Sequence, residues 1–226
     1  YGRYTDGIFQ EQMNMEIYFT EVSDTSGSIT NDLLGLVSEE RQERAKKFRF
    51  DIDRKLSVYS ELLVRYRVCK EFNLLNKEIV FTKNKYGKPF LLNKPTFYFN
   101  ISHTRNALAV AFSNHEIGID VESIKTVDFA IANRFFTSSE RDYLFAHRNP
   151  KRAFYEIWTK KEAYIKWMGT GLSTPLTAFN VLDHMIDSMI HTFETGKYLV
   201  SACCKEITAT KPTIITVTEA EMHKLF

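Results

Sequence analysis

Gly118-Ile119-Asp120-Val121-Glu122 stands in a run of strand-forming residues near the middle of the chain. In a strand, side chains two positions apart point to the same side, so Asp120 and Glu122 share one face. The alternate residues are apolar and are expected in the core. Gly118 carries no side chain and therefore permits another backbone to approach closely.

A second segment, Trp158-Thr159-Lys160-Lys161-Glu162-Ala163-Tyr164-Ile165-Lys166, lies in an apolar stretch with helical spacing. Residues four apart are neighbours on a helix, so Glu162 lies between Trp158 and Lys166. Carboxylates from a strand and a helix, next to cationic side chains, suit a hard divalent cation that bridges phosphate oxygens. Because every ligand is an oxygen, the pattern favours Mg²⁺ over a transition metal. Taken singly, each segment is more typical of a solvated strand face or a salt-bridged helix face.

The composition limits the kind of protein. The chain has 226 residues, of which 44% are hydrophobic, enough for a large core in one domain or two small ones. The net charge is +2, so an anion site must come from local clustering of basic residues. No apolar run approaches the roughly 18 residues of a membrane span, and no signal peptide is recognised. Three cysteines, an odd and sparse number, favour a reducing cytoplasm over a disulfide framework.

The local patterns predict a series of helices and strands. Helices are expected from Thr30 through Leu36, after Ser38, at 53–72, after a capping box formed by Thr137 and Glu140, and from Asn149 to Gly169. Strands are expected at 16–22, 79–82, 178–182, 189–193, 198–204 and 213–217, with an antiparallel meander at 97–102, 108–112 and 117–122.

The two halves of the chain echo one another. Ser38-Glu39-Glu40-Arg41 precedes one long helix, and Ser138-Ser139-Glu140-Arg141 precedes the other. We therefore predict an α+β fold of two similar, pseudo-twofold-related subdomains, each with helices packed on an antiparallel sheet. The predicted halves are residues 15–112 and 113–226, preceded by an extension, residues 1–14, to which no role is assigned. A ligand is expected in the crevice between the halves.

Two further segments carry groups that suit phosphate. Ser102 and His103 end a predicted strand and offer a hydroxyl and an imidazole, although local turn hydrogen bonds are the commoner role of such residues. Arg41 and Arg44 are three residues apart and share one face of a basic helix, where they can grip a phosphate. The alternative for the basic helix is an ordinary solvated surface. Nucleic acid is not expected as a partner, because no recognised module accompanies the basic residues.

In the order and spacing of these segments, the chain resembles the Sfp-type 4′-phosphopantetheinyl transferases, a monomeric class built from two similar halves. The resemblance runs from about Met15 to the strands near Cys204. It includes the turn at 87–89, the segment at 99–103, and the two segments quoted first, which together are specific to the family.

The resemblance implies an activity and a site. These enzymes transfer the phosphopantetheine arm of coenzyme A to a serine of an apo acyl or peptidyl carrier protein, and they release adenosine 3′,5′-bisphosphate. Asp120, Glu122 and Glu162 match the Mg²⁺ ligands, with Mn²⁺ as the alternative metal. The residues that match coenzyme A contacts are Gly87, Lys88, Pro89, Ser102, His103, Lys161 and Lys166, with Arg41 and Arg44 for the 3′-phosphate and Ser57 where a threonine commonly assists.

The implied mechanism is attack of a serine oxygen on the β-phosphorus of coenzyme A. The metal and the lysines neutralise charge on the pyrophosphate. Glu162 and Lys166 are the expected catalytic residues. A carboxylate must take the serine proton, and Glu162 is the first choice, although a role as metal ligand alone stays open.

The resemblance also implies partners and leaves alternatives. The carrier is expected to dock near the crevice, with residues 128–145 and the start of the first long helix as candidate surfaces, and the enzyme is expected to be a cytoplasmic monomer without membrane contact. One alternative is a degenerate relative that binds coenzyme A without transferring. The other is a basic nucleic-acid module, which a net charge of +2 does not favour.

Overall fold

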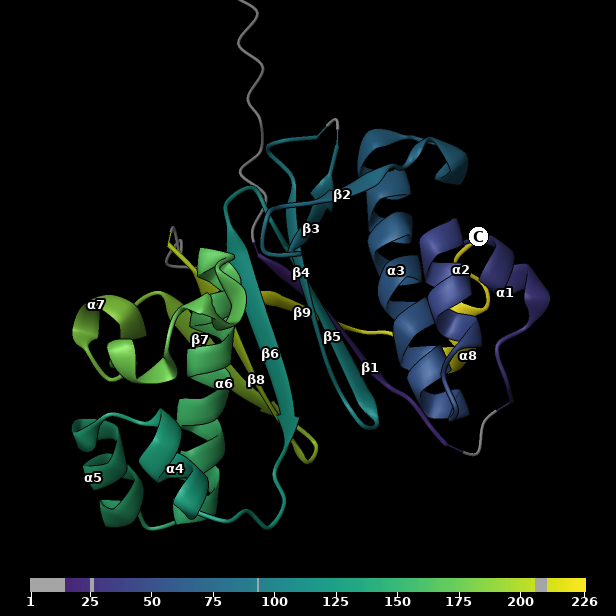
Figure 1. The fold of residues 1–226 in the computed structure, drawn as a ribbon. Coiled ribbons are helices and arrows are strands. Elements are labelled where there is room, and N and C mark those ends of the chain that lie inside the picture. Colours follow the sequence, from purple (N-terminus) through teal and green to yellow (C-terminus); the bar gives the residue numbers. More distant parts are fainter. Residues whose placement is uncertain (1–14, 25–26, 93, 206–210) are drawn as a thin grey trace, which may run out of the picture.

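The computed structural model describes residues 15–24, 27–92, 94–205 and 211–226. Its elements, in chain order (Figure 1), are β1 (Glu16–Glu21), α1 (Asn31–Gly35), α2 (Glu39–Lys46), α3 (Asp51–Phe72), β2 (Phe81–Lys83), β3 (Pro89–Leu91), β4 (Tyr98–Thr104), β5 (Ala107–Ser113), β6 (Ile117–Ser123), α4 (Ala130–Phe135), α5 (Ser138–Ala146), α6 (Pro150–Met168), α7 (His184–Asp187), β7 (Ile190–Thr195), β8 (Tyr198–Cys204), β9 (Thr213–Thr216) and α8 (Glu219–Met222). Short 3₁₀ turns occur at Asn76–Glu78, Gly171–Ser173 and Leu176–Ala178. None of the helices in the described ranges is long and apolar enough to cross a membrane.

Two sheets stand face to face between two long helices. The first sheet has the strand order β4-β5-β1-β9 and the second has β6-β8-β7. Helix α3 covers the outer face of the first sheet and α6 covers the outer face of the second, as Figure 1 shows. The predicted α+β fold of two similar halves is confirmed, and both sheets are antiparallel except where β1 pairs with β9.

Strand β5 explains how the sheets come together. All of its residues are buried, and they alternate in size. Leu108, Val110 and Phe112 pack in the cluster under α3, whereas the intervening alanines pack in the cluster between the sheets. There the small alanines meet the larger side chains of β6, so the two faces interdigitate at the density of a protein interior.

The helix ends follow the residues that were expected to cap them. Thr30 and Ser38 accept hydrogen bonds from the first turns of α1 and α2, and Thr137 forms the predicted capping box with Glu140. Asn149 caps α6, and Gly169 ends it in the left-handed conformation. The helix predicted at 53–72 begins two residues earlier, at Asp51.

The predicted meander is wrong at its third strand. Strand β6 pairs with β8 rather than with β5, so the chain changes sheet between β5 and β6. On the edge of β6 that faces β4, the backbone amides bind side chains of β4 instead of a neighbouring strand. Ile119 N donates to Asn100 Oδ1 at 2.9 Å and Val121 N donates to Ser102 Oγ at 3.4 Å. These two side chains of β4 satisfy backbone groups that a neighbouring strand would otherwise bind.

One other prediction along the tail, a strand at 178–182, is wrong. Residues 178–182 form no strand, because their backbone polar groups are bound by side chains. Lys161 Nζ donates to the carbonyl of Phe179, and Val181 N donates to Glu140 Oε1. Strand β9 forms as expected but pairs in parallel with β1 of the first sheet. After β8 the chain thus returns to the first sheet, although β9 falls within the predicted C-terminal half, residues 113–226.

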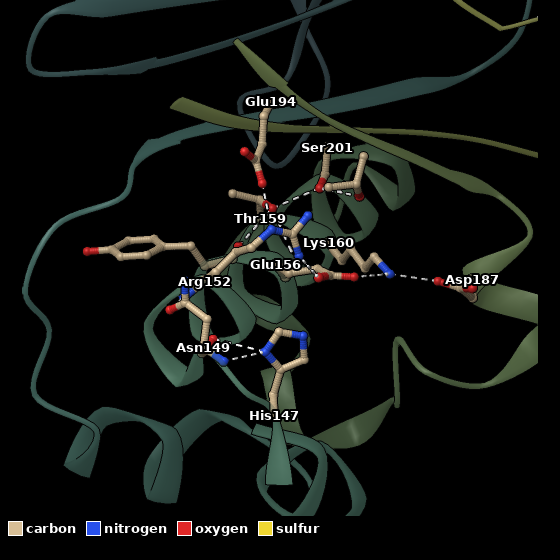
Figure 2. A network of polar contacts seen from close by, with 11 residues as sticks. His147, Asn149, Arg152, Glu156, Thr159, Lys160, Asp187, Glu194 and Ser201 are labelled. Atoms are coloured by element: carbon tan, nitrogen blue, oxygen red, sulfur yellow. Dashed lines mark hydrogen bonds and ion pairs between the residues drawn. The ribbon is translucent and has the colours of Figure 1, made fainter. Parts of the chain in front are cut away.

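A polar network ties the outer part of α6 to the second sheet and to α7 (Figure 2). Thr159 Oγ1 and Ser201 Oγ of β8 are 2.8 Å apart. Arg152 binds Glu194 of β7, and Lys160 binds Asp187 of α7 at 2.8 Å. These polar contacts therefore fix how α6 lies on its sheet.

Gly118 sets how closely α6 lies on β6. A Cβ atom at this position would lie 2.0 Å from the carbonyl oxygen of Ala163 and 2.3 Å from the amide nitrogen of Trp167. Both contacts are backbone atoms of α6, so a side chain could be admitted only by moving the helix. The close approach expected from the sequence at Gly118 is confirmed.

We expect Gly118→Ala to lower the free energy of unfolding by about 3 kcal/mol, since overpacking against backbone cannot be relieved by a rotamer change. Chemical denaturation of the purified variant measures this loss. Gly35→Ala is the matched control, because nothing lies within 4 Å of a Cβ there, and it should change stability by less than about 0.5 kcal/mol. Equal stabilities of the two variants would contradict the crossing as described.

Glu61 of α3 joins α2 to α3. Its carboxylate is 4% exposed and accepts from Ser38 N at 2.6 Å, Ser38 Oγ at 3.0 Å, Arg41 Nε at 3.1 Å and Arg65 Nε at 2.7 Å. Burial raises the pKa of Glu61, but hydrogen bonds from Ser38 and Arg65 outweigh burial, so the pKa lies below its ordinary value. The ionised form is therefore favoured in the folded protein.

Glu61→Gln should destabilise the protein by about 3 kcal/mol near neutral pH, because Arg65 is left buried without its partner charge. The difference from wild type should shrink as the pH falls below the ordinary glutamate range. A pKa lowered by folding contributes stability above the unfolded pKa and loses it as the folded carboxylate protonates. Urea titrations at several pH values test this. Glu43→Gln is the control, since Glu43 forms an exposed pair with Lys46, and it should show little change at any pH.

Candidate active site

The carboxylates predicted as metal ligands come from β6 and α6. Asp120 and Glu122 lie on the face of β6 that Gly118 turns toward α6, and Glu162 lies on α6 itself. Asp120 is 5% exposed. Its Oδ1 accepts from Lys166 Nζ at 2.6 Å and from Ser102 Oγ at 2.8 Å. Strands from both sheets and the helix of the second half therefore meet at one aspartate.

The other two carboxylates, Glu122 and Glu162, both have raised pKa values, in part because of Asp120. Burial raises the pKa of Glu122, and the charge of Asp120 raises it further. Burial likewise raises the pKa of Glu162, with Asp120 adding to the rise and Lys166 opposing it. Mutual repulsion of this kind requires that the carboxylates lie within electrostatic reach of one another. Thr104 Oγ1 donates to Glu122 at 3.3 Å.

The oxygen set fits a divalent cation, although the carboxylates do not form a closed cluster. Among the described residues, no three histidine, cysteine or carboxylate side chains gather closely enough to hold a metal ion. Asp120 Oδ2, however, is buried and has no hydrogen-bond partner. A buried carboxylate oxygen with no partner is costly, and a hard cation would satisfy it while neutralising the repulsion with Glu122 and Glu162.

A basic pocket opens between α2, α3 and the first sheet. It has a volume of about 150 Å³ and is lined by Ser38, Glu40, Arg41, Arg44, Glu61, Val64, Phe81, Lys83, Gly87, Pro89, Phe99 and Ile101. Arg41 donates from NH1 to Ser57 Oγ at 3.2 Å and from Nε to Glu61. Arg44, one helical turn on, lines the same wall. Apolar side chains on one side and guanidinium groups on the other suit a flat ring joined to phosphate.

His103 follows Ser102 on β4, the strand that borders both the pocket and Asp120. The alternation along β4 turns it toward α3, whereas its neighbour Ser102 turns toward β6. Withdrawal from water lowers the pKa of His103, and the positive charges of Lys166 and then Arg44 lower it further. Strand β4 links the basic pocket to the carboxylates, because its Phe99 and Ile101 line the pocket and its Ser102 binds Asp120 and Lys166.

Two predicted phosphate-binding lysines are placed elsewhere. Lys161 is fully buried, and its Nζ binds Glu140 at 2.8 Å and the carbonyls of Leu176 and Phe179. It cannot lie beside a pyrophosphate in the cleft. Lys88 donates to Glu116 and to the carbonyls of Ile117 and Trp167. Its ammonium thus joins the turn at 84–89 to the end of α6, while the flanking Gly87 and Pro89 line the pocket.

Some residues of the site carried no signal in the sequence. Lys83 lines the pocket and pairs with Glu40, yet it stands in an ordinary short strand. Asn100 binds the edge of β6, which depends on where the two sheets meet. Glu61 holds Arg41, and the i,i+4 spacing of Glu61 and Arg65 on a predicted helix was the one available hint.

The chain is similar to known proteins over almost its whole described length. Residues 26–115 match the model of the 4′-phosphopantetheinyl transferase N-terminal domain, and residues 116–218 match that of the 4′-phosphopantetheinyl transferase superfamily. It is 36% identical to the 4′-phosphopantetheinyl transferase ffp of Bacillus subtilis, over 69% of this chain and 70% of that protein.

Two further relatives agree. The chain is 34% identical to the 4′-phosphopantetheinyl transferase gsp of Aneurinibacillus migulanus, over 78% of this chain and 75% of that protein. It is 35% identical to the 4′-phosphopantetheinyl transferase Sfp of Bacillus subtilis strain 168, over 67% and 68%. Together with a fold of two halves and a basic pocket that leads to a carboxylate group, these similarities place the chain in the Sfp-type 4′-phosphopantetheinyl transferase family.

Proposed function

We propose that this enzyme transfers the 4′-phosphopantetheine group of coenzyme A to a serine of an apo carrier protein, with Mg²⁺ bound, and releases adenosine 3′,5′-bisphosphate. The observation that carries the proposal is the continuity of the site. Strand β4 joins its two ends, since Phe99 and Ile101 line the basic pocket and Ser102 binds Asp120 and Lys166. Coenzyme A has the matching order of groups, a nucleotide with a 3′-phosphate followed by a pyrophosphate.

The basic pocket is the proposed nucleotide end. Arg41 and Arg44 stand one helical turn apart and face one opening, where guanidinium groups can bind the 3′-phosphate with two hydrogen bonds each. Phe81, Phe99 and Ile101 supply an apolar wall against which an adenine ring can lie. Ser57 acts on this end through Arg41, to which its hydroxyl is bonded.

The carboxylates and Lys166 form the proposed reacting end. Asp120, Glu122 and Glu162 would hold Mg²⁺, which supplies charge neutralisation on the pyrophosphate. Lys166 and Ser102 offer an ammonium and a hydroxyl 2.9 Å apart, and both can turn to phosphate oxygens. Glu162 is the proposed base for the serine proton, with a role as metal ligand alone as the alternative; burial and Asp120 raise its pKa in the metal-free protein.

The proposed partner is an apo acyl or peptidyl carrier protein, and the enzyme is proposed to act as a cytoplasmic monomer. The carrier would dock beside the cleft on residues 128–145. Most apolar residues there pack inward against Phe154, but Phe145 is 58% exposed. An exposed aromatic ring is a suitable contact for a helical partner.

Incubation with Mg²⁺, coenzyme A and a panel of apo carrier proteins should add one phosphopantetheine group to a carrier, and EDTA should prevent the addition. Intact-mass spectrometry measures it. Asp120→Asn should reduce turnover by at least about 10²-fold, since the amide keeps the shape but loses the charge that a metal requires. Near-normal turnover by a folded Asp120→Asn protein would contradict the proposed role of Asp120.

Arg41→Gln should raise the KM for coenzyme A about tenfold with a smaller change in kcat, because binding of a remote phosphate contributes equally to ground and transition states. Initial rates at varied coenzyme A concentration give both constants. Arg49→Gln is the matched control, since Arg49 stacks on Phe50 and does not line the pocket. A KM unchanged in the Arg41 variant, or raised equally in both, would remove Arg41 from the nucleotide end.

A further inference from the structure

We infer that Lys166 acts as an internal cation that occupies Asp120 when coenzyme A is absent, so that metal and coenzyme A bind cooperatively. The inference rests on the proposed function and concerns the order of events at the same site. It assigns to Lys166 a role before the reaction, in addition to the contact with pyrophosphate that the family resemblance implies.

The contacts show a lysine seated on the expected metal ligand. Lys166 Nζ lies 2.6 Å from Asp120 Oδ1 and 2.9 Å from Ser102 Oγ, and Ser102 Oγ donates to the same Oδ1 at 2.8 Å. The ammonium nitrogen, the hydroxyl oxygen and Oδ1 thus form a closed triangle of hydrogen bonds. The other oxygen, Asp120 Oδ2, is buried without a hydrogen-bond partner. Asp120 is thus half satisfied by Lys166 and half left for another cation.

A metal ion and an ammonium group compete for one carboxylate. Two positive charges a few ångströms apart repel strongly where water is scarce, and the side chain of Asp120 is 7% exposed. Lys166 has the freedom to leave, because its side chain is 27% exposed and ends a flexible four-carbon stem. A metal at Oδ2 would place a second positive charge on the same carboxylate as Lys166, so metal binding is favoured once Lys166 has moved away from Asp120.

Such competition lowers the apparent affinity for metal in a calculable way. If Asp120 is accessible in a fraction f of the molecules, the apparent Kd for metal rises by 1/f. A partly buried ion pair of this kind fits f of about 0.1 to 0.3, which gives a three- to tenfold weaker apparent affinity. Removal of the ammonium should therefore lower the apparent Kd for metal by that three- to tenfold factor.

Coenzyme A would relieve the competition. Its pyrophosphate would offer Lys166 another anion, and Lys166 already contacts Ser102, whose neighbour on β4, Ile101, lines the basic pocket. When Lys166 turns to the pyrophosphate, Asp120 becomes available to the metal. Linkage is reciprocal, so if coenzyme A lowers the Kd for the metal, the metal must lower the Kd for coenzyme A by the same factor.

Binding of Mn²⁺ alone, without coenzyme A, tests the inference on the whole protein. Calorimetry or electron paramagnetic resonance of Mn²⁺ should give a three- to tenfold lower Kd for Lys166→Met than for wild type. Methionine keeps an unbranched side chain, one atom shorter than that of lysine, and removes the charge. An unchanged or higher Kd would overturn the inference.

A general change of charge must be separated from occupancy of Asp120. Lys125→Met is the matched control, because Lys125 is exposed and also acts on Glu122 through its charge but forms no ion pair with Asp120. It should change the Kd by less than about twofold, since an exposed charge is screened. Equal tightening in both variants would show a simple charge effect and would overturn the inference.

A second measurement uses wild-type protein and needs no variant to fold. Acetylation of lysines, followed by peptide mass spectrometry, should label Lys166 faster when Mn²⁺ is added without coenzyme A, while the rate at Lys125 stays constant. Labelling of Lys166 that ignores the metal would overturn the inference. If Mn²⁺ binds neither protein and the transfer assay still succeeds, the inference falls and the transferase stands; if transfer also fails, both fall.

Discussion

The close crossing of α6 over β6 at Gly118 is the constraint on which the rest of the site depends. Backbone atoms of α6 occupy the space that a side chain would take, so the helix lies directly on the strand. Asp120 is two residues further along the same face of that strand, and Glu162 is next to Ala163 of the crossing. The absence of a side chain at Gly118 therefore fixes the distance between the carboxylates of β6 and Glu162 of α6.

The site also needs the two sheets to meet at their edges. Among the described strands, β6 pairs with β8 and with no other, and side chains of β4, Asn100 and Ser102, bind amides on its other edge. Ser102 then reaches Asp120 with the same hydroxyl. Hydrogen bonding that closes the contact between the halves thus also holds the first metal-ligand candidate. Buried backbone groups must find partners, and here their partners are the residues of the site.

Charges on α6 show why spacing along a helix matters more than residue type. Lys166 is four residues after Glu162, about 40° around the helix, and Lys161 is about 140° from Lys166. Lys166 therefore faces the cleft and binds Asp120, whereas Lys161 faces the interior and binds Glu140. In the sequence, both lysines matched family lysines that lie beside the pyrophosphate. The register of the helix on the sheet separates them into a site residue and a core ion pair.

Local sequence patterns determined the elements, the caps of the helices and the identity of the carboxylates. Thr137 with Glu140, and Asn149 with Pro150, act within one turn of backbone, so neighbouring residues are enough to predict them. Asp120 and Glu122 could be assigned to one face because strand alternation is a local rule.

Tertiary structure decided everything that depends on a distant partner. The pairing of β6 with β8 in place of β5, the parallel return of β9, and the loss of a strand at 178–182 all follow from long-range hydrogen bonds. The burial of Lys161 and the contact of Lys166 with Asp120 follow from how α6 lies on its sheet. Sequence separation hides these contacts, since the energy that selects them comes from packing that exists once the chain has folded.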